Sequence, residues 1–120
     1  MTTISTQPET ALSPVQGVTR RFLSDLRQRL DAAFGRRLKH VIVFGSRARG
    51  DAQPESDLDL MIVLEGPIQL WPDIHTIVDS TYPLRLTIDF PIHSLPVSET
   101  SFEAGSCAVH REAKREGVRL

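Results

Sequence analysis

The chain has 120 residues, of which 40% are hydrophobic and 24% are charged. These values are typical of a single globular domain with one hydrophobic core. The formal net charge of −1 argues against nucleic acid as a partner. No apolar run is long enough for a membrane span, and the first residues lack the pattern of a secretory signal, so we expect a cytoplasmic protein. The single cysteine, Cys107, excludes an intramolecular disulfide and a cysteine-rich zinc site.

The first third of the chain predicts a tail followed by a helix. Residues 1–12 are polar and without periodicity, so we expect a flexible tail ahead of a domain that spans residues 13–120. Ser13-Pro14 is a typical helix start, and Gly35 a typical helix end. The apolar positions at helical spacing between them are Val15, Val18, Phe22, Leu26, Leu30 and Ala33. The basic cluster Arg36-Arg37-Lys39 that follows is expected in a solvated loop.

Strand and helix patterns alternate over the rest of the chain. The predicted strands cover residues 41–44, 57–64 and 84–90. The predicted helices cover residues 70–80 and 102–116, with Gly117 as the cap of the second. A turn with a short helix is expected between Gly45 and Gly50. Together these elements predict an α/β (α+β) domain with a small mixed sheet flanked by helices.

Residues at the facing ends of the first two strands indicate a site for a metal-bound triphosphate. Asp57 and Asp59 lie on one face of their strand, about 7 Å apart. Two carboxylates that close repel each other unless a divalent cation lies between them, and Mg²⁺ prefers carboxylate and phosphate oxygens. Gly45-Ser46 ends the preceding strand, where a glycine lets the backbone approach a phosphate closely. Each feature is common alone; their combination at this spacing is specific.

Further residues complete the predicted site. Arg47 and Arg49 are expected to add positive charge near a phosphate, although one of them is expected to face solvent. A third carboxylate is expected from a neighbouring strand, and Asp89 near the end of the 84–90 strand is the best candidate. Because the first strand ends at the site and the second begins there, they are expected to be antiparallel, and the third strand parallel to the first. His93 follows Asp89 closely, but none of the four histidines has ligand spacing, and a surface position is expected for it.

At these residues the chain resembles the minimal nucleotidyltransferases of the polymerase-beta-like superfamily. The shared motif is Gly45-Ser46, ten residues, then Asp57 and Asp59. The residues around this motif, and residues 116–120, are also similar to the corresponding sequences of that family. The resemblance implies the nucleotidyltransferase fold, a two-ion Mg²⁺ site and ATP as the nucleoside triphosphate substrate. It also implies that Asp57, Asp59 and Asp89 bind metal and catalyse transfer, while Gly45 and Ser46 hold the triphosphate.

The resemblance also implies a biological role. Small members of this family act as antitoxins in toxin–antitoxin pairs, and transfer AMP from ATP to a tyrosine of a HEPN-domain ribonuclease toxin. The chain has no apparent second domain for an acceptor, so the acceptor is expected on a partner protein. Two alternatives stay open: masking of the toxin by binding alone, through apolar residues such as Trp71, and nucleotidyl transfer to a small-molecule hydroxyl. Core packing is the expected position of Trp71.

Overall fold

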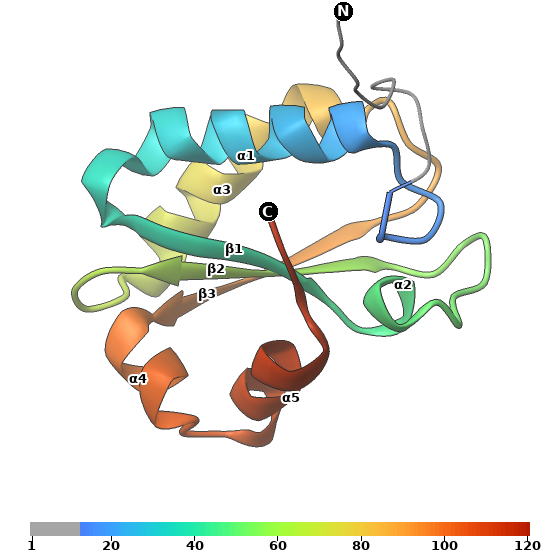
Figure 1. Cartoon of the computed structure of the whole chain (residues 1–120). Coiled ribbons are helices and arrows are strands. Elements are labelled where there is room, and N and C mark those ends of the chain that lie inside the picture. Colours follow the sequence, from blue (N-terminus) through green and yellow to red (C-terminus); the bar gives the residue numbers. More distant parts are fainter. Residues whose placement is uncertain (1–12) are drawn as a thin grey trace, which may run out of the picture.

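A computed structural model describes residues 13–120 and shows a mixed sheet between two layers of helices (Figure 1). The four-stranded sheet has the order β3-β2-β1-β4. Its strands are β1 (Leu38–Phe44), β2 (Leu58–Leu64), β3 (Ile92–Ser98) and β4 (Val118–Arg119). The predicted fold class is therefore confirmed. The tail predicted for residues 1–12 lies outside the described residues.

The helices divide between the two faces of the sheet (Figure 1). They are α1 (Arg20–Phe34), the 3-10 turn η1 (Gly35–Arg37), α2 (Ser46–Arg49), α3 (Leu70–Arg85), α4 (Glu99–Ala104) and α5 (Ala108–Glu116). α1 and α3 cover one face, whereas α4 and α5 cover the other. Within residues 13–120 no helix combines the length and apolarity that a membrane crossing requires.

Side-chain alternation along β2 separates the core into two parts. Leu60 and Ile62 pack in the same cluster as Leu26 of α1 and Ile77 of α3. Met61 and Val63 point to the other face, where they share a second cluster with Phe102 of α4 and Ala113 of α5. Because successive strand residues face opposite sides, Asp59 lies on the same face as Met61. Asp59 therefore opens toward the layer that contains α4 and α5.

The first helix begins later than the sequence predicts. Thr19 is its N-cap, and its side chain accepts a hydrogen bond from the N–H of Phe22. Ser13 instead stabilises a separate turn, in which its hydroxyl donates to the carbonyl of Val18 at 2.7 Å. Gly17 interrupts the helix because its φ of 74° is left-handed. Val15 is buried nevertheless, so the apolar residues at helical spacing include one that lies in this non-helical turn.

The basic cluster after α1 is not a solvated loop. Arg37 forms an ion pair with the buried Asp73 of α3, with 2.9 Å between Nη1 and Oδ1. Lys39 lies in β1 and pairs with Glu65 at 2.9 Å. The Arg37 guanidinium holds the pKa of the Asp73 carboxyl below its usual range. Arg37 therefore fixes the start of β1 to the start of α3.

The predicted third strand over residues 84–90 is wrong. α3 continues through Pro83 to Arg85, and a turn follows in which the N–H of Thr87 donates to the carbonyl of Leu84. Leu84 is buried from the helix, whereas Leu86 is exposed. Their alternation with polar residues therefore arose from a helix end and a turn. The true strand is β3, which begins directly after Pro91.

The directions of the strands are only partly as predicted. β1 and β2 are antiparallel, as expected. β3 runs parallel to β2 and is therefore antiparallel to β1, contrary to the expectation. The connection from β2 to β3 through α3 returns the chain to the end of the sheet where β2 begins. Both strands thus start at the edge of the sheet where Asp57 and Asp59 lie.

The outer edge of β3 is partly closed. Arg85 donates from Nη1 to the carbonyl of Ile92 at 2.8 Å and from Nη2 to the hydroxyl of Ser94. The carbonyl of the preceding residue, Pro91, accepts from the N–H of Leu58 and so points toward β2. Because alternate residues share an edge, Pro96 lies in phase with Ile92 on the outer edge, where it has no N–H to offer.

The final predicted helix is divided into α4 and α5. Gly105 adopts a left-handed conformation with a φ of 63° and ends α4. α5 ends at Gly117, as predicted. A side chain at Gly117 would overlap the carbonyl of Ala113 and the side chain of Ile42, so this glycine allows α5 to lie close against β1.

Candidate active site

Gly45 and Asp59 form the centre of the candidate site because the backbone of one lies against the carboxylate of the other. Phe44, the last residue of β1, pairs with Asp59 of β2. At Gly45 the chain turns with a φ of 79° and a ψ of −159°, a region that is essentially reserved for glycine. A Cβ atom at this position would overlap Oδ2 of Asp59. Gly45 is therefore required because Asp59, an acid of the same motif, leaves no room for a side chain at this position.

The two acids of the motif differ in environment. Asp57 precedes β2 and is exposed, whereas Asp59 lies within β2 and is partly buried. Burial is the largest influence on Asp59 and raises the pKa of its carboxyl, and the nearby Asp57 acts in the same direction. His93 and Arg49 oppose this rise. A cation placed between the two carboxylates would relieve both the burial penalty and their mutual repulsion.

Ser46 lies beside these acids as the first residue of α2. Its side chain is partly exposed. The carbonyl of Gly45 accepts from the N–H groups of Ala48 and Arg49, so α2 begins directly after the glycine turn. Gly45, Ser46, Asp57 and Asp59 are therefore brought together at one end of the sheet.

His93 is a neighbour of Asp59 that the sequence did not assign to the site. The parallel register places His93 of β3 opposite Asp59 of β2. Its Nδ1 lies 3.4 Å from Oδ1 of Asp59, and its side chain is 66% exposed. A correct prediction of β3 from the sequence would have identified His93 as a neighbour of the site, because His93 follows the candidate residue Asp89 closely.

Asp89 is not on a strand. It is exposed in a bend between α3 and β3, and precedes the residue opposite Asp59 by four positions. In the part of the chain that the structure describes, no group of three or more histidine, cysteine, aspartate or glutamate side chains is arranged to hold a metal. Asp89 therefore does not lie on a strand as predicted, and the residue of β3 opposite Asp59 is His93.

Arg47 supports the loop around the site and is 3% exposed. Its guanidinium donates to the backbone carbonyls of Gln16, Pro54 and Ser56, each at 2.9 Å. It also stacks on the ring of Phe90, with its carbon 3.7 Å from the ring centroid. These contacts argue against the predicted role of Arg47 in phosphate binding, because its guanidinium is already bound to backbone carbonyls and to Phe90.

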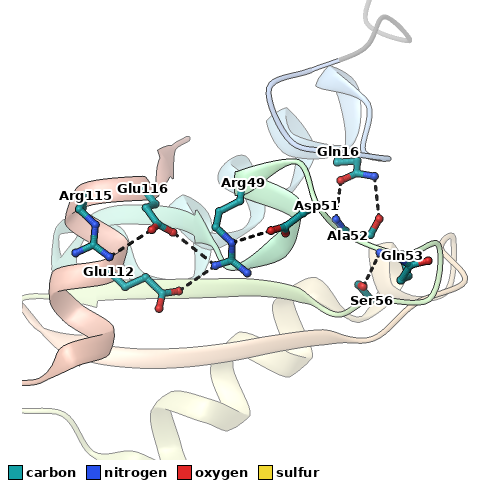
Figure 2. A network of polar contacts seen from close by, with 9 residues as sticks. All are labelled: Gln16, Arg49, Asp51, Ala52, Gln53, Ser56, Glu112, Arg115 and Glu116. Atoms are coloured by element: carbon teal, nitrogen blue, oxygen red, sulfur yellow. Dashed lines mark hydrogen bonds and ion pairs between the residues drawn. The ribbon is translucent and has the colours of Figure 1, made fainter.

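Arg49 lies at the rim of the site and connects α2 to α5 (Figure 2). It forms ion pairs with Asp51 at 3.3 Å, Glu116 at 3.5 Å and Glu112 at 3.7 Å. Arg115 provides a second cation for Glu116. Arg49 is sufficiently exposed to reach a ligand, although a phosphate would compete with three carboxylates.

The loop between α2 and β2 is ordered by local hydrogen bonds (Figure 2). The side chain of Gln16 accepts from the N–H of Ala52 and donates to its carbonyl. The hydroxyl of Ser56 accepts from the N–H of Gln53 at 2.9 Å. These contacts, together with Arg47, define the ten-residue spacing between Ser46 and Asp57 as a structured loop.

A family comparison identifies this arrangement. Residues 20–103 match the model of the nucleotidyltransferase domain, a range that includes Gly45, Ser46, Asp57, Asp59 and His93. The chain belongs to the nucleotidyltransferase domain family. It is accordingly a nucleotidyltransferase, and the resemblance noted in its sequence is confirmed.

The chain is also similar to one curated protein and to two solved structures. The chain is 34% identical over 89 residues to "Putative protein adenylyltransferase MJ0604" of Methanocaldococcus jannaschii, which covers 73% of this chain and 83% of that protein. A mutant of the toxin–antitoxin pair MntA–HpeT is 15% identical, with a TM-score of 0.49 over 83% of this chain and 68% of the other. A putative nucleotidyltransferase from Sulfolobus solfataricus is 21% identical, with a TM-score of 0.44 over 87% and 89% of the two chains.

The side chains present fit a divalent cation with an incomplete protein shell. Nucleotidyltransferases use a nucleoside triphosphate and a divalent metal, and Asp57 and Asp59 offer the carboxylate oxygens that such a cation prefers. No group of three such side chains among the described residues is arranged to hold a metal, so phosphate and water oxygens would supply the other ligands of a bound cation. Such an open shell suits Mg²⁺, which keeps several waters and binds through one or two carboxylates.

Proposed function

We propose that this nucleotidyltransferase is a Mg²⁺-dependent cytoplasmic antitoxin, which transfers AMP from ATP to a tyrosine of a HEPN-domain ribonuclease toxin. Family membership supports the reaction class, and the name of the Methanocaldococcus relative supports a protein as the acceptor. The observation that carries the proposal is the approach of the Gly45 backbone to the Asp59 carboxylate. This approach places the turn proposed to bind phosphate directly against the acid proposed to bind metal.

The chemistry is an in-line displacement at the α-phosphorus of ATP. The tyrosine oxygen forms a new bond to this phosphorus, the bond to the bridging oxygen of the β-phosphate breaks, and pyrophosphate leaves. When bound, the metal ions lower the negative charge that opposes this attack. Asp57 and Asp59 hold the cations, while Gly45 and Ser46 orient the triphosphate.

The transfer of labelled AMP tests this function. The protein is incubated with Mg²⁺, ATP labelled at the α-phosphate and the HEPN-domain protein encoded by a neighbouring gene. We expect label on the partner, and loss of at least about 100-fold in rate with Asp59→Asn. Asp79→Asn is the matched control, because Asp79 is an exposed acid of α3. Equal transfer by Asp59→Asn and the control would refute the assigned site, and the lack of any such neighbouring protein would refute the partner.

Masking of the toxin is a second candidate function, because α3 exposes an apolar surface. Trp71 is 74% exposed, and Tyr82 and Leu86 are 55% and 69% exposed. The expected core position of Trp71 is therefore wrong. Most monomeric domains bury residues of this size, so the surface is suited to contact with a protein.

Two variants separate masking from catalysis. If masking is sufficient, Asp59→Asn still neutralises the toxin, whereas the double variant Trp71→Ser, Tyr82→Ser does not. If transfer is required, Asp59→Asn fails although it still binds the toxin in a pull-down. Ala32→Ser, at an exposed position of α1, is the control for both assays.

A further inference from the structure

One helix carries the large apolar side chains that the fold leaves exposed. Apolar residues scattered singly over a surface need no explanation, whereas a contiguous apolar patch marks an interaction site. Among the described residues, the large hydrophobic side chains that are exposed all lie between positions 70 and 86, and they are Leu70, Trp71, Val78, Tyr82 and Leu86. The patch therefore follows α3 from its first turn to its C-cap.

The patch has the spacing of a helix-packing surface. Exposed residues follow one another along the outer side of α3 at intervals of three or four positions, and they are Trp71, His75, Val78, Tyr82 and Leu86. We call this row the α3 stripe. Rows with this spacing pack against the rows of a second helix. At the rise of an α-helix the stripe is about 22 Å long, which matches a partner helix of about four turns.

The layer formed by α1, η1 and α3 has an excess of positive charge (Figure 1). Residues 20–37 contain six arginines and two aspartates, and α3 adds one arginine and two aspartates. The formal charge of this layer is therefore +3. The remaining described residues contain seven lysines and arginines but ten aspartates and glutamates, which gives −3. The small net charge of the whole chain conceals this asymmetry.

Two arginines of this layer lie along the side of the α3 stripe that faces α1 and η1. Arg29 of α1 reaches α3, where its Nη1 lies 3.5 Å from the carbonyl of Ser80. Arg36 directly precedes Arg37, which binds Asp73 in the first turn of α3. Arg29 and Arg36 are exposed, and within residues 13–120 neither forms an ion pair with an acid. The apolar stripe thus has cations available along one margin.

We propose that the α3 stripe binds an amphipathic helix of a protein partner, and that acidic residues flank the apolar side of this helix. The apolar row fits one side of such a helix, and acidic flanks complement Arg29 and Arg36. A second copy of this chain fits poorly, because two such layers would bring like charges together. The inference rests on the proposed function only for the partner that is tested. Asp59 opens toward the opposite layer, so this contact leaves the candidate active site accessible.

Trp71 reports directly on this surface, because it is the only tryptophan of the chain. The protein is produced with fluorinated tryptophan and titrated with the HEPN-domain protein encoded by the neighbouring gene. We expect the single fluorine resonance to shift as the complex forms, both in the unaltered protein and in Asp59→Asn. ATP with Mg²⁺ alone should leave this resonance in place, because the candidate nucleotide site lies on the other layer.

Binding measurements with the same partner test shape and charge separately. Trp71→Ala should weaken binding at least about tenfold, as expected for an aromatic anchor of an interface. Arg36→Glu should slow association by about threefold to tenfold and make it less sensitive to salt. Arg111→Glu is the matched control and should change neither quantity, because Arg111 is an exposed arginine of α5 on the opposite layer. Circular dichroism verifies that the variants are folded.

Photo-crosslinking from position 71 identifies the occupant of the α3 stripe. We expect the crosslink in a helical, acidic segment of the partner, and a crosslink to a basic segment would overturn the inference. A fluorine resonance that shifts with the concentration of the chain alone would assign the stripe to a second copy instead.

The outcomes separate this inference from the proposed function. Partner binding that leaves the Trp71 resonance unchanged, or that keeps its full strength in Trp71→Ala, would overturn the α3 stripe alone. Binding through the stripe without any transfer of AMP would support the inference and overturn the proposed catalytic role. If the partner does not bind at all, both the stripe as its docking site and the proposed partner are wrong.

Discussion

Substitution of Gly45 by alanine should disrupt the candidate site far more than the same change at Gly50. Both glycines have a positive φ, 79° at Gly45 and 90° at Gly50. At Gly45 the ψ of −159° adds about 1–3 kcal/mol of backbone strain, because that region is essentially limited to glycine. The new methyl group also overlaps the carboxylate of Asp59, and forcing Asp59 off its rotamer adds about 0.5–1.5 kcal/mol.

Gly50 is the matched control for this strain. Its ψ of 15° lies in the ordinary left-handed region, and a Cβ atom there would meet no atom within 4 Å. We therefore expect Gly50→Ala to lower the free energy of unfolding by about 1 kcal/mol. Gly45→Ala should lower it by about 1.5–4.5 kcal/mol, the sum of backbone strain and side-chain displacement.

Urea denaturation and thermal melting measure the two effects. At about 4 °C per kcal/mol for a domain of this size, Gly45→Ala should melt roughly 6–18 °C below the unaltered protein and Gly50→Ala about 4 °C below it. Calorimetry with Mg²⁺ and inorganic triphosphate should show weaker binding only for Gly45→Ala. If the two variants lose the same stability and bind equally, the contact between Gly45 and Asp59 does not organise the site.

Three further predictions concern contacts outside this turn. Asp73→Asn should lower the free energy of unfolding at pH 7 by about 1.5–3 kcal/mol, because it weakens the charged bonds to Arg37. Arg37 lowers the pKa of Asp73 in the folded protein, so this stabilisation is complete above the unfolded pKa near 4 and is lost as the pH falls through the lower folded pKa. The difference in free energy of unfolding between the unaltered protein and Asp73→Asn should therefore shrink between pH 7 and pH 3 in urea titrations. A constant difference would contradict the assignment. Arg47→Met should lower the free energy of unfolding by about 2–4 kcal/mol, because three backbone carbonyls lose their charged donor. Unchanged stability with weaker triphosphate binding would instead show that Arg47 binds the phosphate. Trp71→Ser should change the free energy of unfolding by less than about 0.5 kcal/mol, and a larger loss in urea would show that Trp71 packs in the core.

The sequence predicted best those features that depend on neighbours along the chain. Gly45, Ser46, Asp57 and Asp59 follow from two strands joined by a short loop, and the antiparallel pairing of β1 with β2 brings them together. The buried apolar run of β1 and the glycine that ends α1 were also predicted from the sequence. Each of these signals lies within about twenty residues of the site.

Features that depend on distant packing were missed. The strand predicted over residues 84–90 had the correct alternation, but α3 extends into it because Arg85 bonds to Thr81, Ile92 and Ser94. The third strand therefore covers residues 92–98 instead of 84–90, and its register places His93 opposite Asp59. Arg47 was predicted to bind phosphate because it follows Gly45-Ser46 directly. Its actual partners Gln16 and Phe90 are remote in sequence, so the motif alone could not reveal them.

The partly closed outer edge of β3 restricts how other chains can approach the molecule. An unprotected edge strand is a template for pairing with strands of other proteins, and can begin aggregation. Pro96 offers no donor on that side, and Arg85 already occupies the carbonyl of Ile92. A protein acceptor that adds a strand to this sheet would have to break the Arg85 contact and leave a gap at Pro96. The acceptor hydroxyl should therefore arrive across the open face of the sheet, and strand pairing between two copies of the protein along the β3 edge is disfavoured.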